Sequence, residues 1–234
     1  MSLTQKLSSL DWGIIRDQLQ QRGYSVLEKV CDDKLCLELL ESYQNEGLFR
    51  KTITMSRHSF GRGEYKYFSY PLPQTVQTLR EIFYPPLAEI ANRWSSLTGS
   101  ADRWPVDHRE FLNHCQACGQ SKPTPLMLKY GEGDYNRLHQ DIYGDVFFPF
   151  QIIVLLNEPD VDFTGGELIL VENYPRLQSR PHLPKLSKGA VVIVPTSWRP
   201  IEGSRGWRRA KMRHGVSEVL SGQRHTLGII FHDA

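Results

Sequence analysis

The chain has 234 residues, of which 40% are hydrophobic and 23% are charged, and its formal net charge is +2. These proportions are ordinary for a soluble globular protein, and a chain of this length can bury a sizeable core. No apolar run approaches the roughly 20 residues of a membrane span, and the first residues lack the apolar segment of a secretion signal. Disorder, membrane insertion and secretion are therefore disfavoured, and we expect a cytoplasmic protein.

The chain contains four cysteines, which are too few for a disulfide scaffold and are typical of a reducing compartment. Two of them form a CxxC motif, Cys115 and Cys118, close to His108 and His114. Four such ligands could hold zinc, but structural zinc sites usually have two well-separated ligand pairs. We therefore favour reduced thiols in a loop over a zinc site.

The first hundred residues predict mainly helices. In SLDWGIIRDQLQQRG, Ser9 or Asp11 can cap a helix with apolar residues at helical spacing, and Gly23 follows its end. A second helix is expected from about Asp33 to Glu46.

The stretch LPQTVQTLREIFYPPLAEIANRWSSLTG predicts two helical pieces divided at Pro85 and Pro86. The reason is that proline inside a helix removes a hydrogen bond and clashes with the preceding turn. Before it, FRKTITMSRHSFGRGEYKYFSYPLP alternates and predicts strands joined by a loop. After it, the segment from Thr98 to Pro125 is rich in Gly, Pro, Cys and polar residues, so we expect a connection there.

From TPLMLKYGEGDY onward, short β-branched runs bounded by Gly, Pro, Asn or Asp replace the helical period: FQIIVLLNE, ELILVE, AVVIVP and TLGIIF. Such spacing favours a sandwich or jelly roll, in which two sheets enclose a cavity lined by alternate residues of each strand. We expect an α+β protein forming one domain over residues 1–234. Within this domain, we expect residues 1–124 to form mainly supporting helices, together with strands on the substrate side. Residues 125–234 are expected to form the jelly-roll core with the metal site.

The stretch RLHQDIYGD places His139 and Asp141 two positions apart, just before a long apolar run. The pattern alone is weak, because with 8 His and 26 acidic residues about one His-x-acid match is expected by chance. His108 and Glu110 match it too, but they lie in the expected connection without a suitable partner, and we interpret them as structural. A facial iron site needs two imidazoles and one carboxylate. The candidate third ligand is His214, 73 residues after Asp141 at the edge of a strand.

Ten residues beyond His214 stands Arg224, at the start of the last strand. A dicarboxylate that chelates a metal with one end needs a cation at the other, and arginine binds carboxylate with two parallel hydrogen bonds. If the two strands form a hairpin, a loop of three residues, Ser221–Gln223, would leave the two side chains about 20 Å apart. A loop of about seven residues, Ser217–Gln223, would bring them near 7 Å, so we favour the wider loop.

The sequences LKYGEGDYNRLHQD, FTGGELILVE and RHGVSEVLSGQRHTLGIIFHDA together resemble the Fe(II)/2-oxoglutarate-dependent dioxygenase superfamily. They most closely resemble a bacterial family predicted to act on damaged nucleic acid, of which AlkB is a relative. The resemblance covers most of the chain and is strongest from about Thr124 to the end.

This resemblance implies a double-stranded β-helix, also called a jelly roll, with His139, Asp141 and His214 as ligands of iron(II). It also implies that Arg224 binds the distal carboxylate of 2-oxoglutarate with help from the hydroxyl of Tyr130. The implied reaction uses oxygen and 2-oxoglutarate, releases succinate and carbon dioxide, and oxidises a substrate C–H bond.

The last strands differ from those of AlkB, which carry an arginine-rich pattern well beyond the distal histidine. Here a single arginine follows His214 after ten residues, a spacing more typical of the prolyl-hydroxylase branch. The resemblance therefore leaves three alternatives: an enzyme of nucleic-acid repair, a protein or amino-acid hydroxylase, and a non-catalytic jelly-roll binding protein.

Residues 173–214 contain ten Lys or Arg against one acid, so this segment carries +9 and the remainder of the chain −7. The ten are Arg176, Arg180, Lys185, Lys188, Arg199, Arg205, Arg208, Arg209, Lys211 and Arg213. A basic stretch is often a solvated face, but this one ends at a candidate metal ligand, where phosphates of a polyanion could be held. Trp198 and Trp207 interleave with the cations and could stack on an extruded base. We therefore hypothesise nucleic-acid binding, with an acidic peptide as the alternative.

Two smaller features complete the expected site. Gly165 and Gly166 indicate a bulge or tight turn. An aromatic and basic stretch could form the floor of a substrate pocket or simply pack on the sheet; its members are Arg57, Arg62, Tyr65 and Tyr67.

Overall fold

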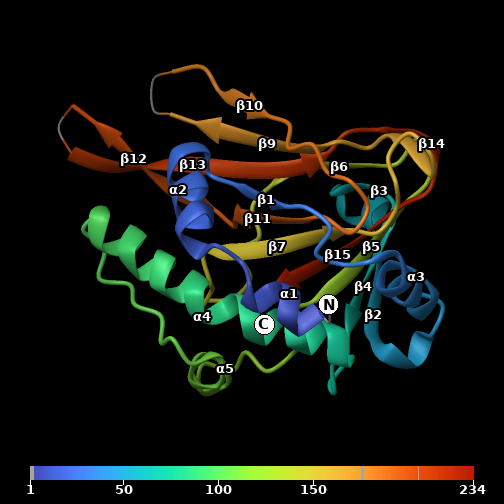
Figure 1. Cartoon of the computed structure of the whole chain (residues 1–234), viewed down its shortest axis with the longest axis horizontal. Helices are drawn as coiled ribbons and strands as arrows, with labels where there is room; N and C mark the ends of the chain where they lie inside the picture. The colour runs from blue at the N-terminus through green and yellow to red at the C-terminus, as the bar shows by residue number, and fades with distance from the viewer. Residues whose placement is uncertain (1–2, 175–176, 205) are drawn as a thin grey trace.

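The computed structural model describes residues 3–174, 177–204 and 206–234. Two antiparallel sheets face one another, and helices cover the outer side of the larger sheet. In Figure 1 the smaller sheet lies above the larger one, and helices α4 (Gln74–Leu97) and α5 (His108–Ala117) lie below it. The predicted α+β class with a jelly-roll core is confirmed.

The larger sheet has seven strands in the order β1-β11-β7-β15-β5-β4-β2. They are β1 (Ser25–Leu27), β2 (Phe49–Thr54), β4 (Glu64–Phe68), β5 (Leu126–Tyr130), β7 (Phe150–Leu155), β11 (Val191–Pro195) and β15 (Arg224–Ile230). Every residue of β7, β11 and β15 is buried, because helices cover one face of the sheet and the second sheet covers the other. This explains why these strands are continuous apolar runs rather than alternating ones.

The smaller sheet has the order β10-β9-β13-β6-β3, with β12 paired to β13. Its strands are β3 (Gly61–Arg62), β6 (Tyr135–His139), β9 (Leu168–Asn173), β10 (Arg180–His182), β12 (Trp198–Gly203) and β13 (Gly206–Val216). A separate two-stranded ribbon pairs β8 (Phe163–Gly165) with β14 (Val219–Gly222). Burial alternates strictly along β9, as expected of a strand with one face toward the interior.

The remaining helices precede α4. They are α1 (Leu3–Ser8), α2 (Trp12–Arg22), α3 (Asp33–Ser42), and the short 3₁₀ helices η1 (Glu46–Leu48) and η2 (Met55–His58). The side chain of Asp11 caps α2 by accepting the Ile14 N–H at 3.0 Å, and Gly23 ends it with a φ of 78°. The predicted start and end of this helix are thus confirmed. The second helix ends at Ser42, earlier than the expected Glu46, and η1 follows.

The predicted division of the long helix at Pro85 and Pro86 is wrong, because α4 runs through both prolines without interruption. A proline in a helix interior costs about 3 kcal/mol. The helix nevertheless continues because it buries a long apolar face, with large side chains such as Phe83 and Trp94 in the main core. Each fully buried side chain of this size contributes about 1.5 to 3 kcal/mol.

The segment from Thr98 to Pro125 is not simply a connection, because it contains α5. Asp107 caps this helix by accepting the N–H of Arg109 at 2.7 Å. His108, Phe111 and Cys115 form its buried side, at a spacing that suits a helix. The polar composition of the segment reflects the exposed side of this helix.

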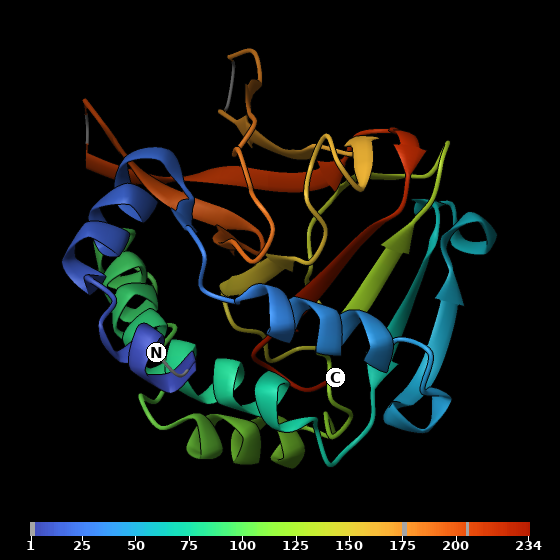
Figure 2. The same cartoon turned by 45° about the vertical axis from the view of Figure 1, so that its right-hand side comes forward.

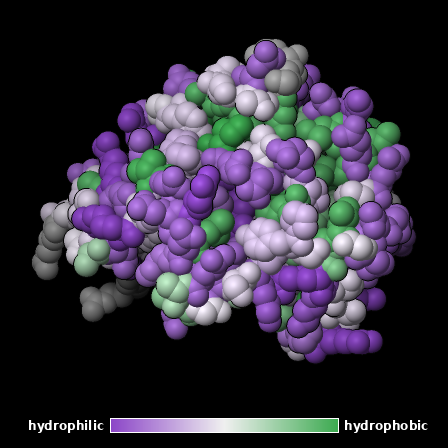
Figure 3. Space-filling model, turned by 90° about the horizontal axis from the view of Figure 1, so that it is seen from below, coloured by the Kyte–Doolittle hydropathy of each residue, from purple (hydrophilic) through white to green (hydrophobic). Residues whose placement is uncertain are grey.

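The main core lies between the helices and the larger sheet, as Figure 2 shows from a second side. The helical side seen in Figure 3 is largely polar with scattered apolar residues. Only small clusters fill the space between the two sheets, so a cavity remains there. In the described part of the chain, no helix has the length and apolar character that a membrane crossing requires.

Candidate metal centre

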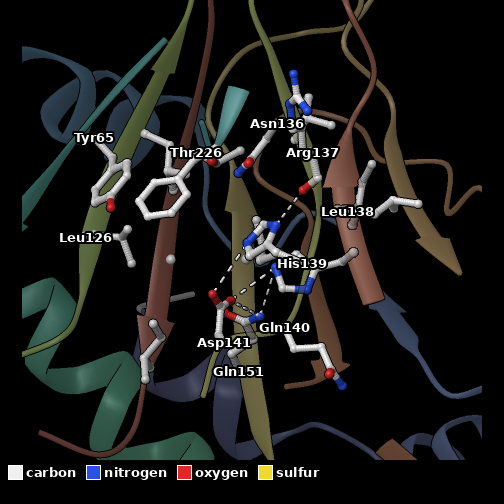
Figure 4. Close-up of a pocket in the computed structure, with 18 of the residues that line it drawn as sticks. Tyr65, Leu126, Asn136, Arg137, Leu138, His139, Gln140, Asp141, Gln151 and Thr226 are labelled. Atoms are coloured by element: carbon white, nitrogen blue, oxygen red, sulfur yellow. Dashed lines mark hydrogen bonds and ion pairs between the residues drawn. The ribbon is translucent and has the colours of Figure 1, made fainter. Parts of the chain in front are cut away.

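A cavity of about 390 Å³ lies between the two sheets. Its walls are mainly apolar, with side chains such as Leu126, Leu128 and Ile153 from the larger sheet. Polar groups converge at one end, where His139 and Asp141 point toward one another above Gln151 (Figure 4). An apolar cavity with a few convergent polar groups is the usual form of a ligand site.

Within the described residues, one group of three or more His, Cys, Asp or Glu side chains is arranged to hold a metal ion: His139, Asp141 and His214. One ligand atom from each lies within 4.8 Å of the others. The two histidines are direct partners across β6 and β13, so their rings meet at 4.3 Å between centroids. His139 Nε2 lies 3.4 Å from Asp141 Oδ1, and His214 Nε2 lies 3.1 Å from Asp141 Oδ2.

The orientation of His139 suits a metal ligand. Its Nδ1 lies 2.7 Å from the carbonyl oxygen of Arg137. A carbonyl only accepts, so Nδ1 carries the proton and Nε2 presents its lone pair to the cavity. The buried Nδ1 of His214 has no hydrogen-bond partner among the described residues.

The carboxylate of Asp141 is buried and held on both sides. The Tyr143 hydroxyl donates to Oδ1 at 2.7 Å, and the Gln151 side-chain amide donates to Oδ2 at 2.7 Å. Burial raises the pKa of Asp141, but His214 and His139 outweigh this effect and leave its pKa well below its usual range. A buried carboxylate with only two imidazoles opposite it suits a divalent cation, so the three side chains fit iron(II).

A β-bulge in β6 orients the side chains that face the cavity. His139 pairs with His214 and Asn136 pairs with Val216, so two steps along β13 face three steps along β6. The bulge lets both Asn136 and His139 line the cavity although they are three residues apart. The guanidinium of Arg137, within the bulge, points away from the histidines in Figure 4. Bulges often redirect side chains beside active sites in this way.

Arg224 lines the same cavity and is fully buried. It begins β15, whereas Gln151 beside Asp141 pairs with Ile230 at the other end of that strand, so Arg224 lies at the opposite end of the cavity. It is the register partner of Tyr130, and its guanidinium lies 5.6 Å from the centre of that ring. Neither Nε nor Nη1 has a hydrogen-bond partner among the described residues. Burial lowers the pKa of Arg224 to about 10. A buried cation with unused donors fits a carboxylate ligand such as the distal end of 2-oxoglutarate.

The hairpin expected between His214 and Arg224 is wrong. β13 pairs with β6 and β9 in the smaller sheet, whereas β15 pairs with β5 and β7 in the larger one. The segment Ser217–Gln223 therefore crosses between the sheets and carries β14, which pairs with β8. Because the two side chains come from facing sheets, both point into the cavity whatever the number of residues between them.

Gly165 and Gly166 lie where the crossing segment meets β8. Both have positive φ, 69° and 63°. A Cβ on Gly165 would lie 2.4 Å from the Glu218 carbonyl oxygen, and one on Gly166 would lie 2.9 Å from Arg224 Cδ. The β8–β14 pairing shifts register here, so the predicted bulge or turn is confirmed. Because Gly166 has no side chain, the aliphatic part of the Arg224 side chain fits beside it.

Tyr65 of the aromatic and basic stretch lines the cavity, whereas the CxxC motif and the nearby histidines do not. Cys115 is buried and Cys118 exposed, and they form no metal-ligating group with His108 and His114 among the described residues. His108 Nε2 lies 2.8 Å from the Phe231 carbonyl oxygen, and its ring stacks on Tyr84, in agreement with a structural role.

The basic segment is less free than its composition indicates. Arg199 is buried against Glu172, Lys188 forms a salt bridge with Asp33, and Arg209 lies over the ring of Trp198. Trp198 also contacts Trp94 in the main core. Arg176 and Arg205 lie outside the described residues. The exposed remainder of the segment is spread over β10, the loop after it and the β12–β13 hairpin, which extends to one side in Figure 1.

Comparisons with known proteins identify the family. A sequence model of an oxygenase family matches residues 63–234, well over half of the chain. The family is described as "Oxygenase, catalysing oxidative methylation of damaged DNA". The chain belongs to this family. Two uncharacterised proteins of Mycobacterium tuberculosis, from strains CDC 1551 / Oshkosh and ATCC 25618 / H37Rv, are each 44% identical over 71% of this chain and 72% of their own.

Solved structures show the same fold. A prolyl-4-hydroxylase of Pseudomonas putida matches with a TM-score of 0.56 and 13% identity, over 96% of this chain and 100% of its own. A 2-oxoglutarate-Fe(II) oxygenase of Burkholderia pseudomallei matches with a TM-score of 0.56 and 14% identity, over 97% of this chain and 94% of its own. The family match and the group of His139, Asp141 and His214, on this fold, support an Fe(II)- and 2-oxoglutarate-dependent dioxygenase that uses oxygen, as predicted.

Proposed function

We propose that this oxygenase acts on damaged or modified nucleic acid, by oxidative demethylation or hydroxylation. The family match over residues 63–234 carries the proposal, because that family is described by its action on damaged DNA. An oxygenase that hydroxylates a methyl group on nitrogen yields a hydroxymethyl group, which breaks down to formaldehyde and the bare base. The fold neighbours named prolyl hydroxylases are too distant in sequence to indicate a substrate.

We further propose that His139, Asp141 and His214 hold the iron, because their ligand atoms converge in the described structure. Arg224 would bind the distal carboxylate of 2-oxoglutarate with Tyr130 beside it. Asn136 donates to the Tyr130 hydroxyl at 3.3 Å and so fixes its position. These roles place the metal and the cationic end of the cosubstrate site at opposite ends of one cavity.

The side chains around these groups have three tasks in the reaction. Iron(II), oxygen and 2-oxoglutarate supply the oxidising chemistry when bound. The Arg137 carbonyl holds the ring of His139, and Tyr143 and Gln151 hold the carboxylate of Asp141, so the ligand geometry is set before binding. The apolar walls between the two ends exclude water and so protect the reaction from competing steps.

The test is succinate formation by the iron-loaded protein, with labelled 2-oxoglutarate and defined substrates. The substrates are methylated single-stranded and double-stranded oligonucleotides, with unmethylated oligonucleotides and a proline-rich peptide for comparison. Stimulation by methylated oligonucleotides, with loss of the methyl group by mass spectrometry, supports the proposal. Stimulation by the peptide alone would contradict it and favour the hydroxylase alternative.

A further inference from the structure

Two large apolar side chains are exposed at the mouth of the cavity. Phe60 is 48% exposed and Leu138 is 43% exposed, and both also line the cavity. Phe60 comes from the turn before β3, and Leu138 from the bulge of β6. Large apolar side chains exposed at the edge of a binding cavity indicate contact with a ligand.

The segments that carry these two side chains are joined by backbone hydrogen bonds. The Arg137 N–H donates to the Phe60 carbonyl oxygen at 2.9 Å, and β3 pairs with β6 through Gly61 and Asn136. The rings of His58 and Phe60 stack at 5.4 Å with an interplanar angle of 22°. The mouth thus presents an aromatic pair on a backbone that is hydrogen-bonded to the strand of a proposed metal ligand.

Three arginines lie on the segments that form this mouth. Arg137 on β6 lines the cavity, and Arg57 on η2 and Arg62 on β3 stand within three residues of Phe60 in the chain. All three are exposed, and none forms a salt bridge with a described residue. The turn between β5 and β6 carries two acidic groups: Glu132 is exposed, and Asp134 accepts the Gly131 N–H at 2.9 Å. We use "rim" for these exposed residues together: Arg57, His58, Phe60, Arg62, Arg137 and Leu138.

The rim differs from the basic segment found in the sequence. In that segment Arg199 and Lys188 already have carboxylate partners, and Arg209 lies over Trp198 and near Asp102. Among the described residues, the rim arginines have no such partners. Arg137 lines the cavity, and Arg57 and Arg62 flank its lining residue Phe60 in the chain. Unpaired cations beside exposed rings are the features that bind the phosphates and bases of a single strand.

We infer that a single-stranded nucleic acid lies across the rim, with its phosphates at Arg57, Arg62 and Arg137 and a base between Phe60 and Leu138. This inference rests on the proposed function and specifies where the polyanion binds. A single strand fits because its bases are free to stack and to enter the cavity, whereas a duplex must first extrude one. The exposed cations of the β10 and β12–β13 region are then not the main contact.

The experiment compares two triple variants by fluorescence anisotropy with a labelled single-stranded oligonucleotide across a salt series. The rim variant is Arg57→Gln, Arg62→Gln and Arg137→Gln. The matched control removes three exposed cations of the basic segment: Arg180→Gln, Arg208→Gln and Lys211→Gln. For a single strand, the slope of log affinity against log salt concentration becomes shallower by about 0.7 for each phosphate contact removed. The rim variant should therefore lower the slope by about 2, and the control should leave it unchanged.

A second pair of variants tests stacking separately from charge. Phe60→Ala should weaken binding about tenfold, because stacking of a base on an aromatic ring is lost. The control is Val161→Ala, an exposed apolar side chain that does not line the cavity. Thermal unfolding and metal affinity of all variants should match the parent, because the substituted side chains are exposed and His139 contacts the backbone carbonyl of Arg137.

The outcomes separate this inference from the proposed function. If the control triple variant loses the salt slope, or both triple variants lose it equally, the nucleic acid does not bind mainly at the rim and the inference is wrong. The proposed function would survive that result. If the parent binds no oligonucleotide at low salt but binds an acidic peptide, both the inference and the proposed function fail.

Discussion

Arg224 and Tyr130 are register partners on neighbouring strands, and the guanidinium lies 5.6 Å from the ring centre. Both side chains are fully buried, yet two nitrogens of the arginine have no hydrogen-bond partner among the described residues. Leaving such donors buried and unpaired costs free energy. A carboxylate that enters the cavity would remove this cost, which is the physical reason to expect an anionic cosubstrate here.

Arg224→Ala should therefore weaken 2-oxoglutarate binding far more than metal binding. Loss of a charge-assisted, bidentate contact costs about 2 to 3 kcal/mol, or about 30- to 150-fold in affinity. Isothermal titration with 2-oxoglutarate, under anaerobic conditions with iron bound, measures the first effect, and iron titration measures the second. Equal losses for both ligands would indicate a damaged fold rather than a lost carboxylate contact.

His139→Ala and Asp141→Ala should each abolish iron binding, because two ligands cannot form the facial set. The fold should remain, since His139 is partly exposed and the main core lies on the other side of the larger sheet. Anaerobic iron titration and thermal unfolding measure the two properties. His114→Ala, a surface histidine, is the matched control. Unaltered iron affinity in both variants would show that the proposed ligands are wrong.

The ligand set could be found in the sequence because strand alternation constrains short spacings. His139 and Asp141 stand two residues apart, so the simplest reading places them together, and a buried β context favours a shared function. His214 and Arg224 could be selected by residue type and position, but not by geometry. Their strands belong to facing sheets, and nothing local in the sequence between them distinguishes a crossing from a hairpin.

Other residues of the site are indicated more weakly by the sequence. Gln151 is the one amide side chain within the apolar run VFFPFQIIVLL, and a polar residue inside a buried strand usually has a partner. Tyr143 stands two residues after Asp141, so alternation could have placed it on the same side. The bulge at Arg137 and Leu138 depends on pairing with a distant strand, which the local sequence does not specify.

Tyr143→Phe should weaken metal binding without removing it. The hydroxyl donates to Asp141 Oδ1 at 2.7 Å and helps to orient this carboxylate. Loss of a partner that orients a metal ligand typically costs about 10- to 100-fold in affinity. Anaerobic iron titration checks the effect, with Tyr135→Phe, at the other end of β6, as the control. Wild-type affinity in Tyr143→Phe would mean that Gln151 alone holds the carboxylate.

Stability should fall as the pH drops from neutral to about 4. Burial lowers the pKa of His108, His225 and His232 to about 4 in the folded protein. A histidine with a lowered folded pKa stabilises the protein above its unfolded pKa of about 6.5, and this contribution is lost as the pH falls from there toward 4. Between those values each histidine should lower the free energy of unfolding by about 1.4 kcal/mol per pH unit.

Urea denaturation of the metal-free protein across this pH range measures that slope. His108→Gln keeps a donor for the Phe231 carbonyl oxygen but cannot titrate, so its slope should be shallower than that of the parent. An identical slope in parent and variant would show that His108 does not take up a proton on unfolding.

Gly166→Ala should weaken 2-oxoglutarate binding although the residue carries no functional group. Its φ is 63°, a conformation that alanine adopts at a cost, and its new methyl group would lie 2.9 Å from Arg224 Cδ. The arginine stem must then shift, and its guanidinium would move away from the position beside Tyr130. Cosubstrate affinity should fall while iron affinity stays near that of the parent, because the metal ligands lie at the other end of the cavity. Gly206→Ala is the matched control: it also has a positive φ, 99°, but an added Cβ there has no described atom within 4 Å. It should therefore show the backbone cost in thermal unfolding without a change in 2-oxoglutarate affinity, and equal affinity losses in both variants would contradict a role of Gly166 in placing the arginine.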